Sequence, residues 1–387
     1  MLNSMLKYSK KFILKILKHI NRSKFKTFIE FFNNPRLLFL EYEIGTSKKK
    51  TNLSQNFYKE KLSFFLENDH DEILGDSQWN SIFNIFHLNI LNLVKEDNSK
   101  FNEVMDNPGE YNLFYGFDGN CKELKQNLKL RNNREAKLLI AQKILSISEY
   151  FGILRLDSEE NFKNNFKRLN VNNLISKIEK KIRIKLKFHN PFPGEEGIVT
   201  NRGIISVREV EAIYQAYRIK IFLDQNKTKS KILEIGGGLG RTAYYCYRLG
   251  LKNYTLVDLK IPLLSQSNYL SRLCGENNII LGGNKKNRIK NSKKIKLVSP
   301  KELFDSNEKF DLIFNSDSLT EIDYKNQKKY INFIKKNSKT FYSINHEKNK
   351  HTVFNLIKPL SSKNKFIYSK SIYWMRKGYL EEIFKFN

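Results

Sequence analysis

The segment KILEIGGGLGRT, residues Lys231–Thr242, carries the clearest structural signal in the chain. A short apolar run typical of a buried strand leads into a glycine-rich turn and then into a segment with helical periodicity. Glycines at such a turn let the backbone approach a ligand closely, and they leave the N–H groups of the following helix facing that ligand. We therefore predict a strand over Lys231–Ile235, a ligand-binding turn and a helix over Thr242–Leu249.

The spacing of the glycines separates two classes of nucleotide-derived cofactor. A dinucleotide-binding turn requires the pattern Gly-x-Gly-x-x-Gly or Ala. Arg241 occupies the last of those positions, where its long side chain would obstruct the close helix–strand packing that glycine permits. The chain instead has an acid two residues before the first glycine and then Gly-x-Gly-x-Gly, which is typical of the S-adenosylmethionine loop of class I methyltransferases. The cofactor-binding residues predicted from this loop are Glu234, Gly236, Gly237, Gly238 and Gly240.

A second acid supports the same cofactor. The next predicted strand, Tyr254–Val257, ends in Asp258, which lies 18 residues after Gly240. A carboxylate at the tip of the second strand accepts hydrogen bonds from ribose hydroxyls in folds of this kind. Asp258 could instead cap the helix that follows it, but we favour the ribose role because loop and acid occur together where the strand order reverses. We add Ser316, which follows a later strand, to the predicted cofactor set.

The C-terminal half alternates short apolar strands with helical stretches, which is the pattern of a parallel, doubly wound sheet. A closing pair of strands, connected through Lys377-Gly378, suits an antiparallel hairpin at the edge of the sheet. We expect an α/β, Rossmann-like, seven-stranded class I methyltransferase domain over residues 191–387. The predicted strands are Lys231–Ile235, Tyr254–Val257, Ile295–Val298, Phe310–Phe314, Thr340–Ile344, Phe366–Trp374 and Tyr379–Lys385.

The N-terminal half, residues 1–190, has mostly helical periodicity and no catalytic spacing. Helical patterns occur around Trp79–Leu93 and over Glu135–Phe151. A Pro/Gly loop at His189–Gly197 separates the two halves, and Ser206–Glu209 then matches a capping box that opens a helix. We predict a helical N-terminal region that covers the acceptor of the reaction.

Composition excludes some classes of protein and leaves others open. Hydrophobic residues make up 40% of the 387, which is enough for packed cores and excludes wholesale disorder. Lys and Arg number 69 against 40 Asp and Glu, so the formal net charge is +29, which attracts nucleic acid, anionic membranes and phosphorylated substrates. The chain is rich in Lys, Asn, Ile and Phe throughout, as an AT-rich genome would encode, so charge alone assigns no partner. Three scattered cysteines fit a reducing compartment better than a disulfide framework or a zinc cluster.

Two basic segments stand out. Residues 6–26 carry Lys and Arg without any acid, and an apolar stripe through Ile13 and Ile20 predicts a basic amphipathic helix. This helix would suit an anionic membrane surface, or it would pack on the protein itself. The run Asn284–Lys296 would form a solvated loop or a clamp for a phosphate-bearing acceptor. No apolar run approaches the ~20 residues that span a bilayer, so we predict a cytoplasmic protein, with peripheral contact at the inner face of the membrane left open.

Polar clusters follow two predicted strands, at the edge where open α/β sheets bind ligands. His346 is the predicted general base, because the ordinary pKa of histidine suits proton removal near pH 7. Glu347 or Asp317 would orient it, and Asp317 could serve as the base itself. The alternatives are a loop histidine that only bonds the backbone and an Asx-turn at Asp317. These residues and Glu321 could ligate a metal, yet no spacing demands one, and we predict none.

A likeness to a known family rests on four stretches of the C-terminal half: Leu233–Tyr245, Tyr254–Ser267, Asn315–Glu321 and Ser343–Glu347. Together they resemble a bacterial family of sugar O-methyltransferases, and Ile205–Ile219 resembles the segment that precedes the cofactor loop there. The resemblance implies methyl transfer from S-adenosylmethionine to a hydroxyl of a glycan, polysaccharide or glycosylated intermediate. The acceptor could be free, nucleotide-linked or lipid-linked.

Two functions of other classes stay open, an RNA methyltransferase that uses the basic surface and a non-catalytic basic scaffold. Enzymes that modify nucleic-acid bases need a stacking pocket and base flipping. Asn315–Ser318 departs from the Asn-Pro-Pro-aromatic type of signature expected after the fourth strand, which disfavours nucleic acid as a partner. The intact glycine loop and Asp258 argue against a scaffold.

Overall fold

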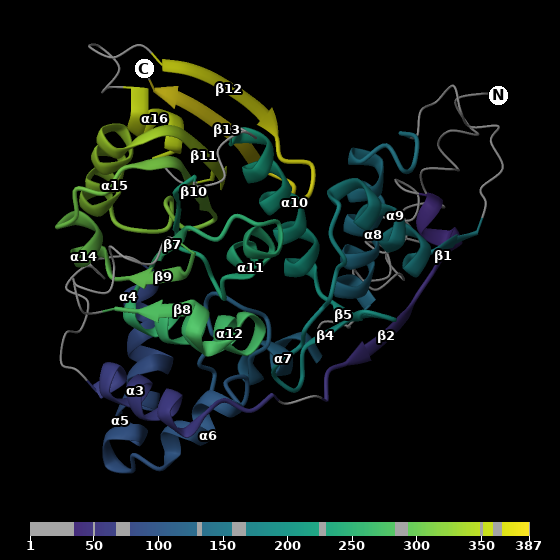
Figure 1. The fold of residues 1–387 in the computed structure, drawn as a ribbon. Coiled ribbons are helices and arrows are strands. Elements are labelled where there is room, and N and C mark those ends of the chain that lie inside the picture. The colour runs from purple at the N-terminus through teal and green to yellow at the C-terminus, as the bar shows by residue number, and fades with distance from the viewer. Residues whose placement is uncertain are drawn as a thin grey trace, which may run out of the picture.

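An eight-stranded sheet forms the centre of the C-terminal half (Figure 1). Its order is β12-β13-β11-β10-β6-β7-β9-β8, and all neighbours pair in parallel except the two pairs that contain β13. The predicted Rossmann-like α/β fold of class I methyltransferases is therefore confirmed, with an antiparallel hairpin at one edge. The strands are β6 (Ile232–Ile235), β7 (Tyr254–Val257), β8 (Ile279–Leu281), β9 (Ile295–Val298), β10 (Phe310–Ser316), β11 (Ser338–His346), β12 (Phe366–Ile372) and β13 (Tyr379–Phe386).

The computed structural model describes residues 35–48, 51–66, 78–129, 134–156, 168–223, 230–282, 293–348, 351–358 and 366–386. The predicted amphipathic helix at residues 6–26 and most of the basic run before Lys296 lie outside these ranges. Within them, no helix combines the length and the apolar character needed to cross a membrane.

The expectation of seven strands is wrong by one, because β8 adds an eighth beside β9. Ile279 pairs with Ile295 and Leu281 with Leu297, both in parallel. Only three residues form this strand, directly after a short 3-10 turn over Glu276–Asn278. Periodicity needs roughly four residues or more to reveal a strand, so a strand of this length is not predictable from its apolar pattern.

Helices cover both faces of the sheet, as a buried parallel sheet requires. Leu312 and Phe314 of β10 pack in the cluster with α10, α11 and α12, whereas Ile313, between them, packs in the cluster with α14, α15 and α16. Successive side chains of β10 thus point to opposite faces of the sheet, as the two-residue period of a strand requires. These helices are α10 (Val207–Phe222), α11 (Arg241–Arg248), α12 (Lys260–Cys274), α14 (Pro300–Phe304), α15 (Tyr324–Asn337) and α16 (Val353–Ile357).

The described part of the N-terminal half is mainly helical, as expected. The pattern around Trp79–Leu93 forms a nearly continuous helix in which the π-helical turn Phe83–His87 separates two α-helical pieces. Figure 1 shows α3 close to α12 and α8 beside α10. The helices are α3 (Gln55–Leu66), α4 (Gln78–Ile82), α5 (Leu88–Glu96), α6 (Lys100–Asp106), α7 (Lys122–Lys129), α8 (Arg134–Tyr150) and α9 (Val171–Ile182).

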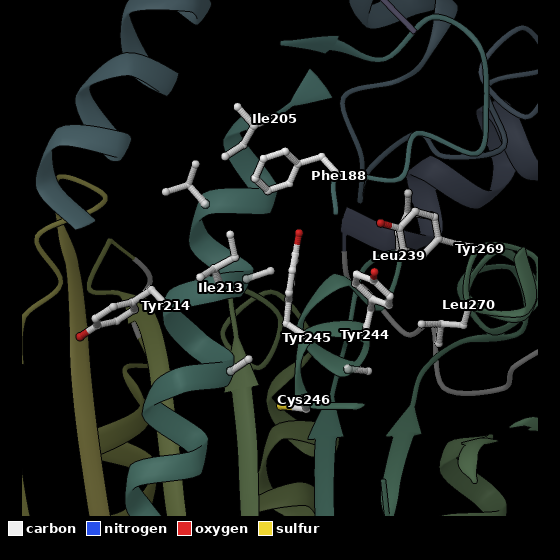
Figure 2. Packing of buried hydrophobic residues seen from close by; sticks show 14 of the residues in the cluster. Phe188, Ile205, Ile213, Tyr214, Leu239, Tyr244, Tyr245, Cys246, Tyr269 and Leu270 are labelled. Carbon is white, nitrogen blue, oxygen red and sulfur yellow. The ribbon is translucent and has the colours of Figure 1, made fainter. Parts of the chain in front are cut away.

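A small three-stranded sheet connects residues on both sides of the predicted boundary at residue 190. Strand β2 (Glu43–Thr46) pairs antiparallel with β4 (Glu196–Thr200), which pairs with β5 (Gly203–Ile205). One hydrophobic cluster also runs through both halves, and Figure 2 shows Phe188 in it near the tyrosines of α11. The helical half is thus packed firmly on the sheet-forming half.

The predicted helix after the Pro/Gly loop is present, but its capping box is not. Ser206 is the N-cap of α10 and accepts no capping hydrogen bond. Glu209 turns instead toward Arg241, whose Nε lies 3.3 Å from its Oε1, and accepts a hydrogen bond from Tyr245. The predicted capping box does not form, because the buried guanidinium of Arg241 attracts the Glu209 carboxylate more strongly than a backbone N–H would.

Arg241 is the centre of a buried ion cluster. Its Nη2 lies 2.7 Å from Glu195, its Nη1 pairs with Asp118, and its Nε faces Glu209. All four side chains are at most 9% exposed. Burial raises the pKa of Glu209 to about 7, while the positive charge of Arg241 acts in the opposite direction.

Replacing Arg241 tests how strongly this cluster holds the two halves together. Arg241→Met leaves three buried carboxylates unpaired, and we expect a loss of about 3–5 kcal/mol of unfolding free energy at pH 8. A group whose folded pKa is raised stabilises the protein below its unfolded pKa and loses that contribution as the pH rises through the folded value. The loss in the variant should therefore be smaller at pH 5 than at pH 8.

Urea denaturation at the two pH values measures both effects. Arg248→Met on the same helix is the matched control, because Arg248 hydrogen-bonds the Tyr244 hydroxyl and the Lys185 carbonyl and forms no ion pair within the described residues. It should lose about 1 kcal/mol. Equal losses in the two variants would show that Arg241 has no special structural role.

Candidate cofactor and acceptor site

The glycine-rich turn has the backbone geometry that its sequence implies. Gly236, Gly238 and Gly240 have φ values of 70°, 56° and 85°, which L side chains rarely adopt. A Cβ on Gly236 would lie 2.2 Å from Ser318 Oγ, whereas a Cβ on Gly238 would meet nothing closer than the Phe117 carbonyl oxygen at 3.5 Å. Gly236 is therefore needed for packing, while Gly238 lies against open space.

That space is a cleft at the carboxyl edge of the sheet. Its empty volume is about 1140 Å³, a figure that includes space open to solvent. Gly240 does not line the cleft but is the N-cap of α11. The other predicted cofactor residues all line it: Glu234, Gly236, Gly237, Gly238, Asp258 and Ser316.

Asp258 connects the second strand to the turn. Its Oδ2 accepts from the Gly237 N–H at 3.1 Å and from Gln266 Nε2 at 2.8 Å, and its Oδ1 accepts from the Leu259 N–H at 2.9 Å. The last contact resembles the helix-capping alternative, and the first two hold the carboxylate at the cleft. Its hydrogen bonding to a ribose stays a prediction.

Glu234 lies behind the turn and is only 2% exposed. Its Oε2 accepts from the Tyr254 hydroxyl at 2.8 Å. Burial, with a smaller contribution from nearby Asp258, raises the pKa of Glu234 to about 8, so the carboxyl is mostly protonated at neutral pH. The residue thus presents a neutral hydrogen-bonding group to the cleft instead of a charge.

Asp317 follows β10 in a left-handed conformation, with φ 61°, which is uncommon for a residue other than glycine. Its carboxylate accepts from Arg376 Nη1 at 2.6 Å and from the Tyr379 hydroxyl at 2.7 Å. Both partners come from the C-terminal hairpin. The sequence had no signal for them, because the pairing depends on the order of strands in the sheet.

His346 ends β11 and stands opposite Tyr379 in the register of the sheet. One of its nitrogens lies within 4.8 Å of carboxylate oxygens of Asp317 and Glu321. His346 does not line the cleft, and its buried Nδ1 has no hydrogen-bond partner among the described residues. The structure thus brings His346 close to Asp317, and its role as general base stays a prediction.

Glu347 lies apart from this group. It is exposed and forms an ion pair with Lys370 of β12, at 3.1 Å. The three atoms of Asp317, Glu321 and His346 are close enough to meet at one cation. Both carboxylate oxygens of Asp317 already accept hydrogen bonds from protein groups, and the expected absence of a metal remains a prediction.

The helical half contributes cleft residues that the sequence did not single out. Trp79 of α4 and Phe117 line the cleft, and their rings stack with centroids 6.4 Å apart and planes 27° apart. Arg208 of α10 lines it too and lies loosely, 3.8 Å from Asp317 and 3.5 Å from Glu211. From sequence alone, an aromatic residue in a helical pattern is interpreted as part of the hydrophobic core. Nothing in the sequence therefore marked Trp79 as a residue of the cleft.

No protein-family model and no curated protein match the chain. Solved structures of similar fold include an O-methyltransferase from Bacillus cereus in complex with SAH, at 11% identity and a TM-score of 0.33, over 62% of this chain and 96% of that one. Another is magnesium protoporphyrin IX methyltransferase from Synechocystis with bound SAH, at 10% identity and a TM-score of 0.34, over 46% and 85%. A third is a glycopeptide N-methyltransferase complexed with S-adenosyl-L-methionine, at 11% identity and a TM-score of 0.32, over 44% and 86%.

The two glycines of the turn should respond differently to alanine. Both variants suffer the cost of a left-handed side chain, about 1–2 kcal/mol. Gly236→Ala adds a clash with Ser318, and we expect it to lose a further 1–3 kcal/mol or so. Chemical denaturation measures the difference, and equal stability of the two variants would contradict the close approach at Gly236.

Proposed function

We propose that the chain is an S-adenosylmethionine-dependent O-methyltransferase that acts on a sugar hydroxyl. The observation that carries the proposal is one cleft in which the glycine turn and Asp258 share walls with Asp317, Glu321 and Trp79. A cofactor-binding turn and a group of acid–base residues are thus in reach of one bound pair of reactants. The resemblance to sugar O-methyltransferases in the same segments supports the choice of acceptor.

The cofactor half of the cleft fits a nucleoside with an attached amino acid. The turn offers backbone N–H groups, Asp258 offers a carboxylate for ribose hydroxyls, and Ser316 offers a hydroxyl at the end of β10. When bound, S-adenosylmethionine supplies an electrophilic methyl group. S-adenosylmethionine contains no pyrophosphate, so its site does not need the last glycine of the dinucleotide-binding pattern. Arg241 occupies that position in this chain.

The acceptor half of the cleft combines an aromatic face with charged hydrogen-bonding groups. Trp79, supported by Phe117, presents a flat apolar surface of the kind that packs against the C–H face of a sugar ring. Arg208, Asp317 and Glu321 offer donors and acceptors for hydroxyls around that ring.

The protein contributes alignment and proton transfer to the reaction. An alcohol is a poor nucleophile, so holding its oxygen in line with the reacting carbon supplies most of the acceleration. A positioned base adds roughly 10²–10⁴-fold. The group of Asp317, Glu321 and His346 is where that base belongs, and the sequence predicts His346 for the role.

Two substitutions test cofactor binding. Asp258→Ala removes the predicted ribose acceptor, and we expect binding of S-adenosylmethionine to weaken by about 1–3 kcal/mol, or about 5–150-fold. Gly238→Val fills the space beside the turn and should abolish measurable binding. Isothermal titration calorimetry gives the affinities, and Asp305→Ala, at the exposed C-cap of α14, is the control. Unchanged affinity in both variants would falsify the proposed cofactor site.

The acceptor is tested by incubating the protein with methyl-labelled S-adenosylmethionine and a panel of acceptors. The panel holds p-nitrophenyl glycosides, nucleotide sugars and a structured RNA. We expect label on one or more sugars and none on RNA. Label on RNA alone would refute the sugar assignment while leaving cofactor binding intact.

A further inference from the structure

We propose that Glu321 is the residue that accepts the proton of the attacked hydroxyl, an inference that rests on the function proposed above. Glu321 lines the same cleft as the glycine turn, whereas His346 and Glu347 do not. A base must reach the hydroxyl directly or through one water. On this criterion Glu321 is better placed than the histidine that the sequence predicts.

The turn that carries Glu321 is hydrogen-bonded to the residue that precedes the cofactor loop. The Glu321 N–H donates to the Ser318 carbonyl at 2.9 Å, and Ser318 Oγ donates to the carbonyl of Ile235 at 2.9 Å. Asn315 Nδ2 donates to the same Ile235 carbonyl at 2.8 Å. Ile235 precedes the first glycine of the turn, so Glu321 is held at a fixed distance from the place where the methyl donor binds.

Asp317 is the neighbouring acid, and its surroundings differ from those of Glu321. The Asp317 carboxylate accepts hydrogen bonds from Arg376 and Tyr379, and Arg208 lies 3.8 Å from it. Each of its two oxygens is therefore already engaged by a side chain of the C-terminal hairpin. Asp317 serves instead to hold Arg376 and Tyr379 beside the acceptor.

Glu321 has no ion pair within 4.0 Å among the described residues. Its carboxylate is bonded by the Gln78 side chain of α4. Burial raises the pKa of Glu321 to about 7 and the negative charge of Asp317 adds to the rise, while Gln78, Arg208 and Arg376 act in the opposite direction. A carboxylate with a pKa near the working pH takes a proton readily and releases it again.

His346 completes the surroundings of Glu321. It lies in the same group of atoms, within 4.8 Å, and its buried Nδ1 lacks a partner in the described part of the chain. A histidine next to Glu321 but outside the cleft lining is suited to orient the carboxylate. We therefore treat it as a positioning residue.

The proton balance is simple. As the acceptor oxygen forms its bond to the methyl carbon, the bond from that carbon to sulfur breaks and its electron pair neutralises the sulfonium. The oxygen loses its proton to the Glu321 carboxylate, which later gives it to water. The products are the methyl ether, S-adenosylhomocysteine and one proton.

The test uses the full chain and the glycoside that the wild-type protein methylates best. Glu321→Gln keeps the shape and the Gln78 contact but cannot take up the proton, so we expect kcat to fall about 10²–10⁴-fold. The affinity for S-adenosylmethionine should stay within about twofold, as expected for a group that acts in the transition state. Glu321→Asp should retain part of the activity, and Glu103→Gln, an exposed acid on α6, is the matched control.

The pH dependence gives a readout that a structural role would not produce. The wild-type kcat should rise with pH through about 7 and then level off, because only the ionised carboxylate accepts a proton. The residual activity of Glu321→Gln should lack this step. Melting temperatures of all variants show whether the fold is intact.

Three results would overturn the inference. One is a Glu321→Gln protein with wild-type kcat, and a large loss in His346→Ala alongside it would assign the base to His346. Another is activity that EDTA abolishes and Mg²⁺ restores, because Glu321 would then hold a cation. A wild-type protein that fails to bind S-adenosylmethionine would refute the proposed function itself, so the two failures can be told apart.

Discussion

The buried guanidinium of Arg241 joins three separate parts of the chain to the cofactor turn. Arg241 is the first residue of α11, directly after the glycine turn. Its three carboxylate partners come from different parts of the chain: Asp118 from the helical half, Glu195 from the Pro/Gly loop and Glu209 from α10. Each acid would be strongly destabilising if it were buried alone. Their common partner therefore fixes where the helical half and the connecting loop meet the cofactor turn.

The same interaction also closes the cleft. Phe117 precedes Asp118, and its carbonyl oxygen is the atom nearest to the open side of Gly238. Trp79 stacks on the Phe117 ring, so the aromatic wall of the acceptor half is carried by the segment that the Arg241–Asp118 pair holds in place. The contacts that pack the two halves together thus also form one wall of the cleft. A separate sheet domain without the helical half would lack this wall.

Local sequence was sufficient for the elements but insufficient for their partners. The strands and the glycine turn were predictable because apolar period and glycine spacing are properties of neighbouring residues. Ser206–Glu209 shows the limit, since the spacing of a capping box was present and the carboxylate of Glu209 bonded elsewhere. Strand β8 shows a second limit, because three residues are too few to reveal the apolar alternation of a strand. Long-range pairs such as Asp317 with Arg376 follow from the strand order alone.

The acids of the site illustrate why chemistry is harder to predict than fold. Asp317 and Glu321 lie four residues apart and look equivalent in the sequence. The hairpin brings a guanidinium and a phenol to Asp317, while Glu321 receives a neutral amide from α4. Burial raises the pKa of Glu321 to about 7, and the negative charge of Asp317 adds to the rise. Residues distant in the chain thus give two acids that are four positions apart different surroundings, which only the folded arrangement reveals.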